Sequence, residues 1–181
     1  MKKFLTFLPL LIFAVIASYF YLGLGRDKDT LPSALIDKPI PQFALPALDD
    51  ASKILSRDIV QGDGITLINF FASWCVPCRA EHPQLLALQR MQDDLGLRLI
   101  GIAWKNKRDE AQQFLQELGN PFAITLHDEK GRTGIDFGVY GLPETYVIDQ
   151  AGHIRYRHVG PILPETLRDR ILPVIKSLGA S

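Results

Sequence analysis

The feature that most constrains this chain is a hydrophobic run that ends in its only two cysteines. The run 65–71 is followed closely by Trp74 and Cys75, and Cys78 comes three residues later, giving the spacing C-x-x-C. If a helix begins at Cys75, the first sulfur lies at the exposed helix N-terminus, where free N–H groups and the helix dipole favour a thiolate. The second cysteine then lies on the same helix face, within reach of the first. This spacing predicts dithiol/disulfide exchange, in which Cys75 attacks and Cys78 resolves the mixed disulfide.

Two other uses of the cysteine pair are less consistent with the sequence. A purely structural disulfide would close a very short ring, which removes little entropy from the unfolded chain. A metal site needs more ligands than two thiolates, yet there is no second C-x-x-C or C-x-x-H, and the four histidines are scattered. We therefore predict a redox-active disulfide between Cys75 and Cys78, with no metal and no cofactor.

Length and charge favour one folded domain behind an apolar N-terminal segment. The 181 residues are 47% hydrophobic and carry a formal net charge of zero, so we expect neither a second domain nor a nucleic-acid partner. Residues 4–25 carry no charge and follow Lys2 and Lys3. A helix of this length can span a bilayer, and the two lysines favour a cytoplasmic N-terminus. The cysteines would then lie on the outer, more oxidising side of the membrane.

The alternative for this segment is a cleaved signal peptide, because small residues occur around Ala17. The apolar run continues beyond them, so we expect a retained anchor over residues 1–25. Residues 26–38 are polar and contain Pro32, which is typical of a linker. The folded domain is expected over residues 39–181.

Hydrophobic periodicity within residues 39–181 predicts alternating strands and helices. Strand, helix and strand joined by short connections imply a parallel sheet, and a terminal hairpin adds an antiparallel part. With the C-x-x-C motif at a strand-to-helix junction, this order resembles the thioredoxin fold. That fold is a three-layer α/β fold with a mixed central sheet flanked by helices, here with an added N-terminal strand and an inserted helix and strand. The expected elements are an edge strand at 41–46, a short helix after 56, strands at 65–71 and 97–104, helices at 75–94 and 109–118, an extended segment at 122–126, a hairpin at 146–149 and 154–159, and a helix after 164 that is broken near Pro173.

Two stretches carry a resemblance to one known family. They are W-C-V-P-C-R-A-E-H-P at 74–83 and G-V-Y-G-L-P-E-T-Y-V-I-D at 138–149. Together with residues 152–160, they resemble the DsbE (CcmG) family of membrane-tethered thiol:disulfide proteins for cytochrome c maturation. The similarity extends from about residue 39 to the end of the chain. Leu142 departs from the pattern, because the smaller Ala or Val is expected there.

The resemblance implies a reductive role on the periplasmic side of the inner membrane. A membrane thiol donor would supply electrons, and the protein would keep the haem-binding cysteines of apocytochrome c reduced. Haem-handling maturation proteins are the alternative partners. Carried over to this chain, it implies Cys75 as nucleophile, Cys78 as resolving thiol and Pro143 as a cis-proline that faces them. The Leu142 backbone would then be free to pair with a substrate strand. Without the resemblance, a trans turn proline is the ordinary expectation for Pro143.

Two carboxylates are candidates for tuning the thiols. Glu81 follows Cys78 by three residues, and Glu144 follows Pro143, so both are expected near the cysteines. Like charge raises a thiol pKa, and a less stabilised reduced form makes the couple more reducing. The alternative is that both glutamates are solvated surface groups.

Other residues near the motif have more general expected roles. Trp74 is expected to shield the site and contact partners, or else to be a core aromatic. Pro77 presets the helix start and is expected to tune the redox couple. Arg155 and Arg157 alternate with apolar residues and are expected on a solvated strand face.

Two other functions remain open from the sequence. One is a general periplasmic thiol-disulfide reductase or isomerase. The other is a non-catalytic haem or copper chaperone that uses the thiols as ligands, although a copper-delivery protein of similar fold normally has C-x-x-x-C spacing and a distant histidine.

Overall fold

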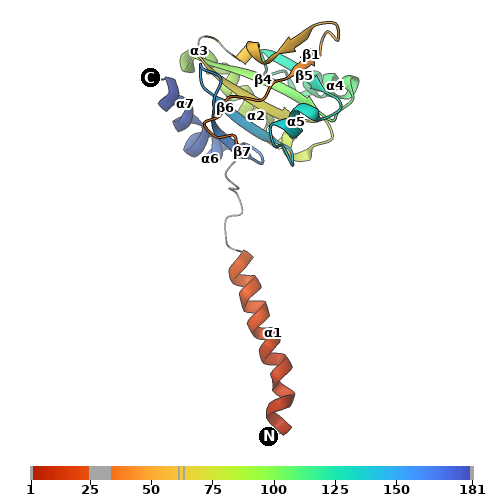
Figure 1. The fold of residues 1–181 in the computed structure, drawn as a ribbon, viewed down its shortest axis with the longest axis vertical. Helices are drawn as coiled ribbons and strands as arrows, with labels where there is room; N and C mark the ends of the chain where they lie inside the picture. Colours follow the sequence, from red (N-terminus) through yellow and green to blue (C-terminus); the bar gives the residue numbers. More distant parts are fainter. Residues whose placement is uncertain (1, 25–33, 61, 63, 180–181) are drawn as a thin grey trace. The chain divides into compact units, whose positions relative to one another are not determined.

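The computed structural model of this chain describes residues 2–24, 34–60, 62 and 64–179, and within the first helix it describes the side chains of residues 8–21. The chain divides into two compact units, Met1–Pro32 and Ser33–Ser181. Figure 1 shows the fold of each unit. Most of the predicted linker, residues 26–33, lies outside the described residues, as do the two ends of the predicted anchor, Met1 and Gly25.

The second unit is built on a five-stranded mixed sheet with the order β5-β4-β3-β6-β7. The parallel strands are β3 (Ile65–Phe71), β4 (Leu97–Trp104) and β5 (Ile124–Asp128). The antiparallel strands are β6 (Glu144–Ile148) and β7 (Ile154–Val159). All seven residues of β3 are buried, as expected for a central strand that is covered on both faces. The mixed thioredoxin-like sheet is therefore confirmed.

The predicted N-terminal strand forms part of a separate small sheet. Strands β1 (Ala44–Pro46) and β2 (Ile54–Ser56) pair with each other in antiparallel fashion. A bridge between Ala47 and Leu126 connects this pair to the edge strand β5. A 3-10 helix, η1 (Arg57–Val60), follows β2 where a short helix was expected.

The helices agree with the predicted positions but are more interrupted. One predicted helix over 75–94 is divided into α2 (Val76–Arg90) and α3 (Gln92–Leu95), and Gly96 in the left-handed conformation ends α3. The inserted helix α4 (Arg108–Leu118) is as predicted, whereas α5 (Arg132–Asp136) was not expected. The C-terminal segment comprises α6 (Pro164–Thr166), a π-helical turn η2 (Leu167–Ile171) and α7 (Leu172–Gly179).

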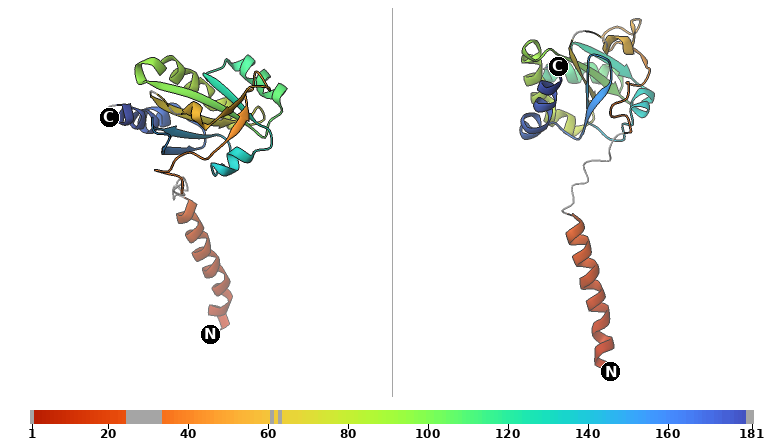
Figure 2. Two further views of the ribbon diagram at one scale, coloured as in Figure 1. Left: turned by 45° about the horizontal axis from the view of Figure 1, so that its top comes forward. Right: turned by 60° about the vertical axis from the view of Figure 1, so that its left-hand side comes forward.

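Two apolar clusters fill the opposite faces of the sheet. Because strand side chains alternate, Leu67 and Phe71 of β3 join one cluster, and Ile68 and Phe70 join the other. The first cluster contains both cysteines and receives residues of α2, α4 and the C-terminal helices. The second receives the N-terminal extended segment and the residues after α5. Figure 2 shows α2 and the C-terminal helices on one side of the sheet and the N-terminal segment on the other.

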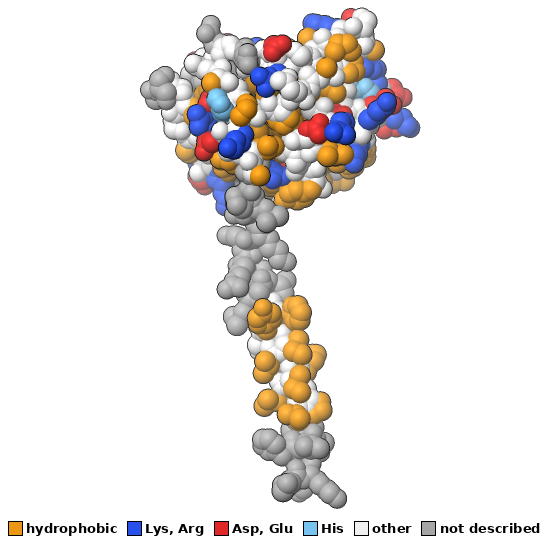
Figure 3. Space-filling model, in the orientation of Figure 1, with side chains coloured by type: hydrophobic (Ala, Val, Ile, Leu, Met, Phe, Trp, Pro, Cys, Tyr) orange, Lys and Arg blue, Asp and Glu red, His pale blue; other side chains and the backbone are white. Residues whose placement is uncertain are grey.

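The first unit contains a single described helix, α1 (Lys2–Leu24), with Pro9 inside it. Large apolar side chains are exposed along its described part, which is visible as the orange stretch of this helix in Figure 3. Within the described residues, no helix has the length and hydropathy that a membrane crossing requires. The anchor therefore stays a prediction.

Candidate active site

The two cysteines form a disulfide at the start of α2. Cys75 is the N-cap of this helix, and Cys78 lies in its first turn, with the two sulfurs 2.01 Å apart. The backbone N–H of Cys78 donates to Cys75 Sγ at 3.1 Å. Pro77 lies in the first two helical positions, where its missing N–H costs no hydrogen bond. The Cys75 sulfur therefore lies where the free N–H groups and the helix dipole stabilise a thiolate.

The exposure of Cys75 differs from the prediction. Cys75 is 4% exposed and Cys78 is 1% exposed, so the expectation of an exposed first sulfur is wrong for the oxidised protein. The reason is that the two bonded sulfurs belong to the apolar cluster on the α2 face, where partly buried Leu142 packs against the same cluster. The neighbouring side chains of Trp74 and Val76 are instead exposed, at 56% and 79%.

A loop after β4 holds the residues that precede the first cysteine. Buried Asn106 accepts a hydrogen bond from the Ser73 backbone N–H at 2.7 Å, and its Nδ2 donates to Ser73 Oγ at 2.9 Å. The Trp74 indole Nε1–H donates to the Lys105 carbonyl at 3.1 Å. Trp74 is therefore an exposed and oriented aromatic, which excludes the core alternative. No sequence pattern pointed to Asn106, because its partner Ser73 lies far away in the chain.

The segment before β6 has the geometry that the family resemblance implied. The peptide bond between Leu142 and Pro143 is cis. Pro143 is buried, and its carbonyl accepts a hydrogen bond from the Gly160 N–H at 2.9 Å, just after β7. Leu142 and both cysteines meet at the same apolar cluster. The structure thus brings together the C-x-x-C motif and the G-V-Y-G-L-P-E-T segment.

Glu81 is a buried acid on the cysteine side of the sheet. Its side chain is 0% exposed, so the solvated alternative is wrong for this residue. Glu81 Oε1 accepts from Asn69 Nδ2 and Oε2 accepts from the Ile162 N–H, both at 2.9 Å. Burial raises the pKa of Glu81 to about 7, although these two hydrogen bonds act in the opposite direction. Because Glu81 follows Cys78 by three residues on α2, the two lie on the same helix face.

Glu144 does not crowd the cysteines. It is opposite Phe70 in the β3–β6 pair, so its side chain lies on the sheet face away from α2. The charge of Glu144 is also compensated, because its Oε2 is 2.7 Å from the Arg157 guanidinium and accepts a hydrogen bond from the Tyr146 hydroxyl at 2.9 Å. The prediction of two carboxylates beside the thiols is therefore wrong for Glu144. The solvated alternative is wrong as well, because Glu144 is 0% exposed.

The same ion pair corrects the expectation for the two arginines of β7. The Arg157 side chain is only 9% exposed, because it reaches inward to the buried Glu144 carboxylate. Its NH2 group also donates to the Gly138 carbonyl at 2.9 Å, which ties the G-V-Y-G segment to β7. Arg155 does lie on the solvated face and pairs there with Asp37 and Asp149.

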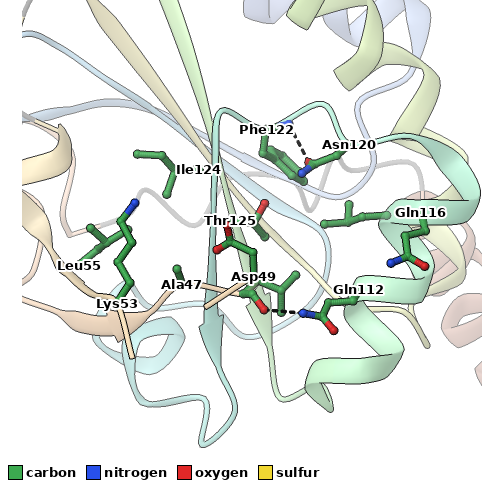
Figure 4. Close-up of a pocket in the computed structure, with 12 residues that line it drawn as sticks. Ala47, Asp49, Lys53, Leu55, Gln112, Gln116, Asn120, Phe122, Ile124 and Thr125 are labelled. Atoms are coloured by element: carbon green, nitrogen blue, oxygen red, sulfur yellow. Dashed lines mark hydrogen bonds between the residues drawn. The ribbon is translucent and has the colours of Figure 1, made fainter. Parts of the chain in front are cut away.

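The cavity in Figure 4 is separate from the cysteine motif. It has a volume of about 360 Å³ and lies between β2, α4 and β5, and its walls include Lys53, Gln112 and Thr125. None of the predicted site residues lines it. Across the described residues, no group of three or more His, Cys, Asp or Glu side chains is placed to hold a metal ion.

The C-x-x-C disulfide lies at the start of a helix, directly after the central strand and beside a cis-proline segment. This arrangement defines a thioredoxin-fold thiol-disulfide oxidoreductase. The Redoxin family model matches residues 36–170. The thiol:disulfide interchange protein DsbE of Allochromatium vinosum is 43% identical, with 93% of this chain and 91% of the relative covered. DsbE of Escherichia coli K12 is 41% identical, with 96% and 95% covered. The chain belongs to the DsbE family of thiol:disulfide interchange proteins.

A solved structure supports the fold assignment independently. The secreted thiol-disulfide isomerase of Corynebacterium glutamicum superposes with a TM-score of 0.64 at 21% identity, covering 75% of this chain and 84% of that chain. At this level of identity the similarity concerns the fold alone.

Proposed function

We propose that this protein is a membrane-tethered periplasmic reductant that keeps the haem-binding cysteines of apocytochrome c reduced during cytochrome c maturation. The observation that carries the proposal is the similarity to DsbE relatives over nearly the whole chain. The E. coli relative matches 96% of it, a share that must include most of the apolar segment 4–25. A retained N-terminal anchor fits this match, and a membrane thiol protein on the same side is the expected electron donor.

The exchange reaction uses the two cysteines in sequence. The Cys75 thiolate attacks one sulfur of a partner disulfide, and the other partner sulfur leaves as a thiolate that takes a proton from water. The Cys78 thiol then loses its proton, and its thiolate attacks Cys75 Sγ and releases the partner's remaining sulfur. Two electrons pass to the partner, and this chain is left with the Cys75–Cys78 disulfide of the present structure.

Glu81 is suited to take the proton from Cys78. It lies one helical turn after Cys78 in the same buried layer, and its pKa of about 7 lets it exist in both forms near neutral pH. Its ionised form also disfavours a nearby thiolate, which raises the thiol pKa. A less stabilised reduced form corresponds to a reducing couple, which supports the reductive direction.

The surface around Cys75 supports a protein substrate. Trp74, Val76 and Tyr140 are large apolar side chains that are exposed beside the motif and the cis-proline segment. Such exposed groups are typical of a surface that a partner covers. The backbone of Leu142 would pair with an extended partner segment there.

The test is to trap partners of the full chain covalently with the Cys78→Ala variant. This variant forms the first mixed disulfide but has no thiol to release it. Recovery of apocytochrome c as the main adduct is expected. The double variant Cys75→Ala with Cys78→Ala is the matched control and should capture nothing.

Other adducts would contradict the proposal. Capture of many unrelated secreted proteins, together with efficient reduction of insulin, would assign a general reductase or isomerase. Haem or copper that copurifies with the wild type in the absence of any disulfide adduct would assign a chaperone. The location is tested separately: the full chain should stay in the membrane fraction after alkaline extraction, and release of a shortened chain would show that the N-terminal segment is cleaved.

A further inference from the structure

The buried side-chain amide of Asn69 has one polar atom without a partner. Asn69 lies in the middle of β3 and is 0% exposed. Its Nδ2 donates to Glu81 Oε1 at 2.9 Å and to Thr145 Oγ1 at 3.1 Å. Among the described residues, its Oδ1 has no hydrogen-bond partner although the atom is buried. An unpaired buried carbonyl is costly, so its presence beside the buried acid requires an explanation.

The surroundings of Glu81 favour only its ionised form in this arrangement. Both carboxylate oxygens accept hydrogen bonds, one from Asn69 Nδ2 and one from the Ile162 N–H. A protonated carboxyl group carries an O–H and needs an acceptor. The Asn69 amide can supply one, if its oxygen takes the place of its nitrogen.

Thr145 is compatible with both orientations of the amide. It is directly opposite Asn69 in the antiparallel β3–β6 pair, so the two side chains lie on the same sheet face. A hydroxyl is both donor and acceptor: it accepts from Nδ2 in the observed orientation and donates to Oδ1 in the reversed one. The unpaired amide atom is the oxygen in the observed orientation and would be the nitrogen in the reversed one.

We propose that Asn69 is a positioning residue that serves both protonation states of Glu81 by reversing its side-chain amide. When Glu81 is ionised, Nδ2 donates to Oε1, as in this structure. When Glu81 carries a proton, its O–H donates to Oδ1, and the Ile162 N–H remains on the other oxygen. The link to catalysis rests on the proposed proton transfer from Cys78 to Glu81, but the reversal itself does not.

Other titratable groups among the described residues face this cluster from α2 and β7. On α2 they are the two cysteines in the reduced protein and His82, whose Nε2 bonds the Gly119 carbonyl at 2.8 Å and whose pKa is lowered by burial. On β6 the neighbouring Glu144 lies on the opposite sheet face and is paired with Arg157 from β7. His158 of β7 is directly opposite Thr145 and so lies on the same sheet face as the cluster, where its Nε2 is 3.4 Å from the Pro161 carbonyl oxygen. The segment before α6 contributes a backbone N–H, and β3 contributes the Asn69 amide itself.

The test is an NMR titration of the oxidised full chain in detergent micelles. The Glu side-chain carboxyl carbons and the Asn side-chain amides would be followed from about pH 5 to about pH 9, which brackets the pKa of Glu81. The Asn69 side-chain amide signals should move with the same midpoint as the Glu81 carboxyl carbon. An Asn69 amide that does not respond to the titration of Glu81 would overturn the proposal, and this measurement needs no variant.

Two variants sharpen the result. Asn69→Leu should raise the Glu81 midpoint by about one unit, because the charged form loses a stronger hydrogen bond than the neutral form loses. Thr145→Val keeps the Asn69–Glu81 contact and should move the midpoint by less than about half a unit. An unchanged midpoint in Asn69→Leu would also overturn the proposal.

The catalytic link has a separate readout. The pH profile of mixed-disulfide resolution should shift in Asn69→Leu in the same direction as the Glu81 midpoint. If Glu81→Gln resolves mixed disulfides at the wild-type rate, the proposed proton transfer fails, while the titration still decides whether the amide reverses.

Discussion

The buried carboxyl of Glu81 should make the stability of the folded chain depend on pH. Burial raises the pKa of Glu81 from 4.5 to about 7. An acid whose pKa is higher in the folded state binds its proton more tightly there, so its contribution to stability is fully present below the unfolded pKa. That contribution is lost as the pH rises through the folded pKa. The loss of stability therefore develops from about pH 4.5 to about pH 7 and is complete above this range.

The size of the effect follows from the two pKa values. They differ by about 2.5 units, which at about 1.36 kcal/mol per unit corresponds to about 3 kcal/mol of unfolding free energy. The Glu81 side chain is 0% exposed, so solvent screening does not reduce this figure. Gln at position 81 cannot ionise and avoids the loss.

The assay is urea unfolding of the oxidised Ser33–Ser181 unit at a series of pH values, for the wild type and for Glu81→Gln. Between about pH 4 and about pH 8, the wild type should lose about 3 kcal/mol of unfolding free energy relative to Glu81→Gln. Glu117→Gln is the matched control, because Glu117 is 49% exposed on α4 and should show no such change. Parallel pH profiles for the wild type and Glu81→Gln would refute the reasoning.

Two further predictions concern the second glutamate. Arg157→Met should lower the unfolding free energy by about 3 to 5 kcal/mol, because it leaves the buried Glu144 carboxylate without its cation. Arg155→Met on the solvated face should lower it by about 1 kcal/mol or less. Equal losses in the two variants would contradict a stabilising role of the buried pair. Alkylation of Cys75 against pH in the reduced protein should give the wild-type pKa in Glu144→Gln and a lower pKa in Glu81→Gln, because Glu81 is the one of these two glutamates that lies on the cysteine side. A lower pKa in Glu144→Gln would restore the two-carboxylate interpretation.

The parts of the fold that the sequence predicted are those with strong apolar patterns. The run 65–71 coincides with β3, because every residue of this strand is buried and the whole segment is therefore apolar apart from Thr66 and Asn69. Helix α5 has no such pattern. Its buried residues are Thr133 and Gly134, so it shows no apolar periodicity. Gly134 packs against the Trp104 indole, which leaves no space for a side chain.

The C-terminal segment shows how a local conflict is resolved without loss of the buried face. Pro173 has no N–H to continue the helical hydrogen bonds, and a break was expected there. The structure places a π-helical turn at Leu167–Ile171, two residues before the proline. Leu167, Ile171 and Ile175 remain in the core on the α2 face, so the apolar spacing is maintained across the irregular turn.

The acid beside the cysteines could have been chosen correctly from the sequence. Its position three residues after Cys78 favoured Glu81, and its position next to the implied cis-proline favoured Glu144, but helix and strand periodicities distinguish the two. A spacing of three residues keeps Glu81 on the helix face of Cys78, whereas alternation along β6 separates Glu144 from Thr145.

The decisive signal is Asn69, a polar residue in an otherwise apolar central strand that needs a buried partner. Asn69 lies two residues from Phe71, which packs on the cysteine face, so its side chain points to that face as well. Its cross-strand neighbour is Thr145, which leaves Glu144 on the far face and makes Glu81 the acid that Asn69 bonds. A polar residue within a buried strand thus identifies the sheet face that carries the acid, and strand alternation then selects which of the two carboxylates lies on the same face as the cysteines.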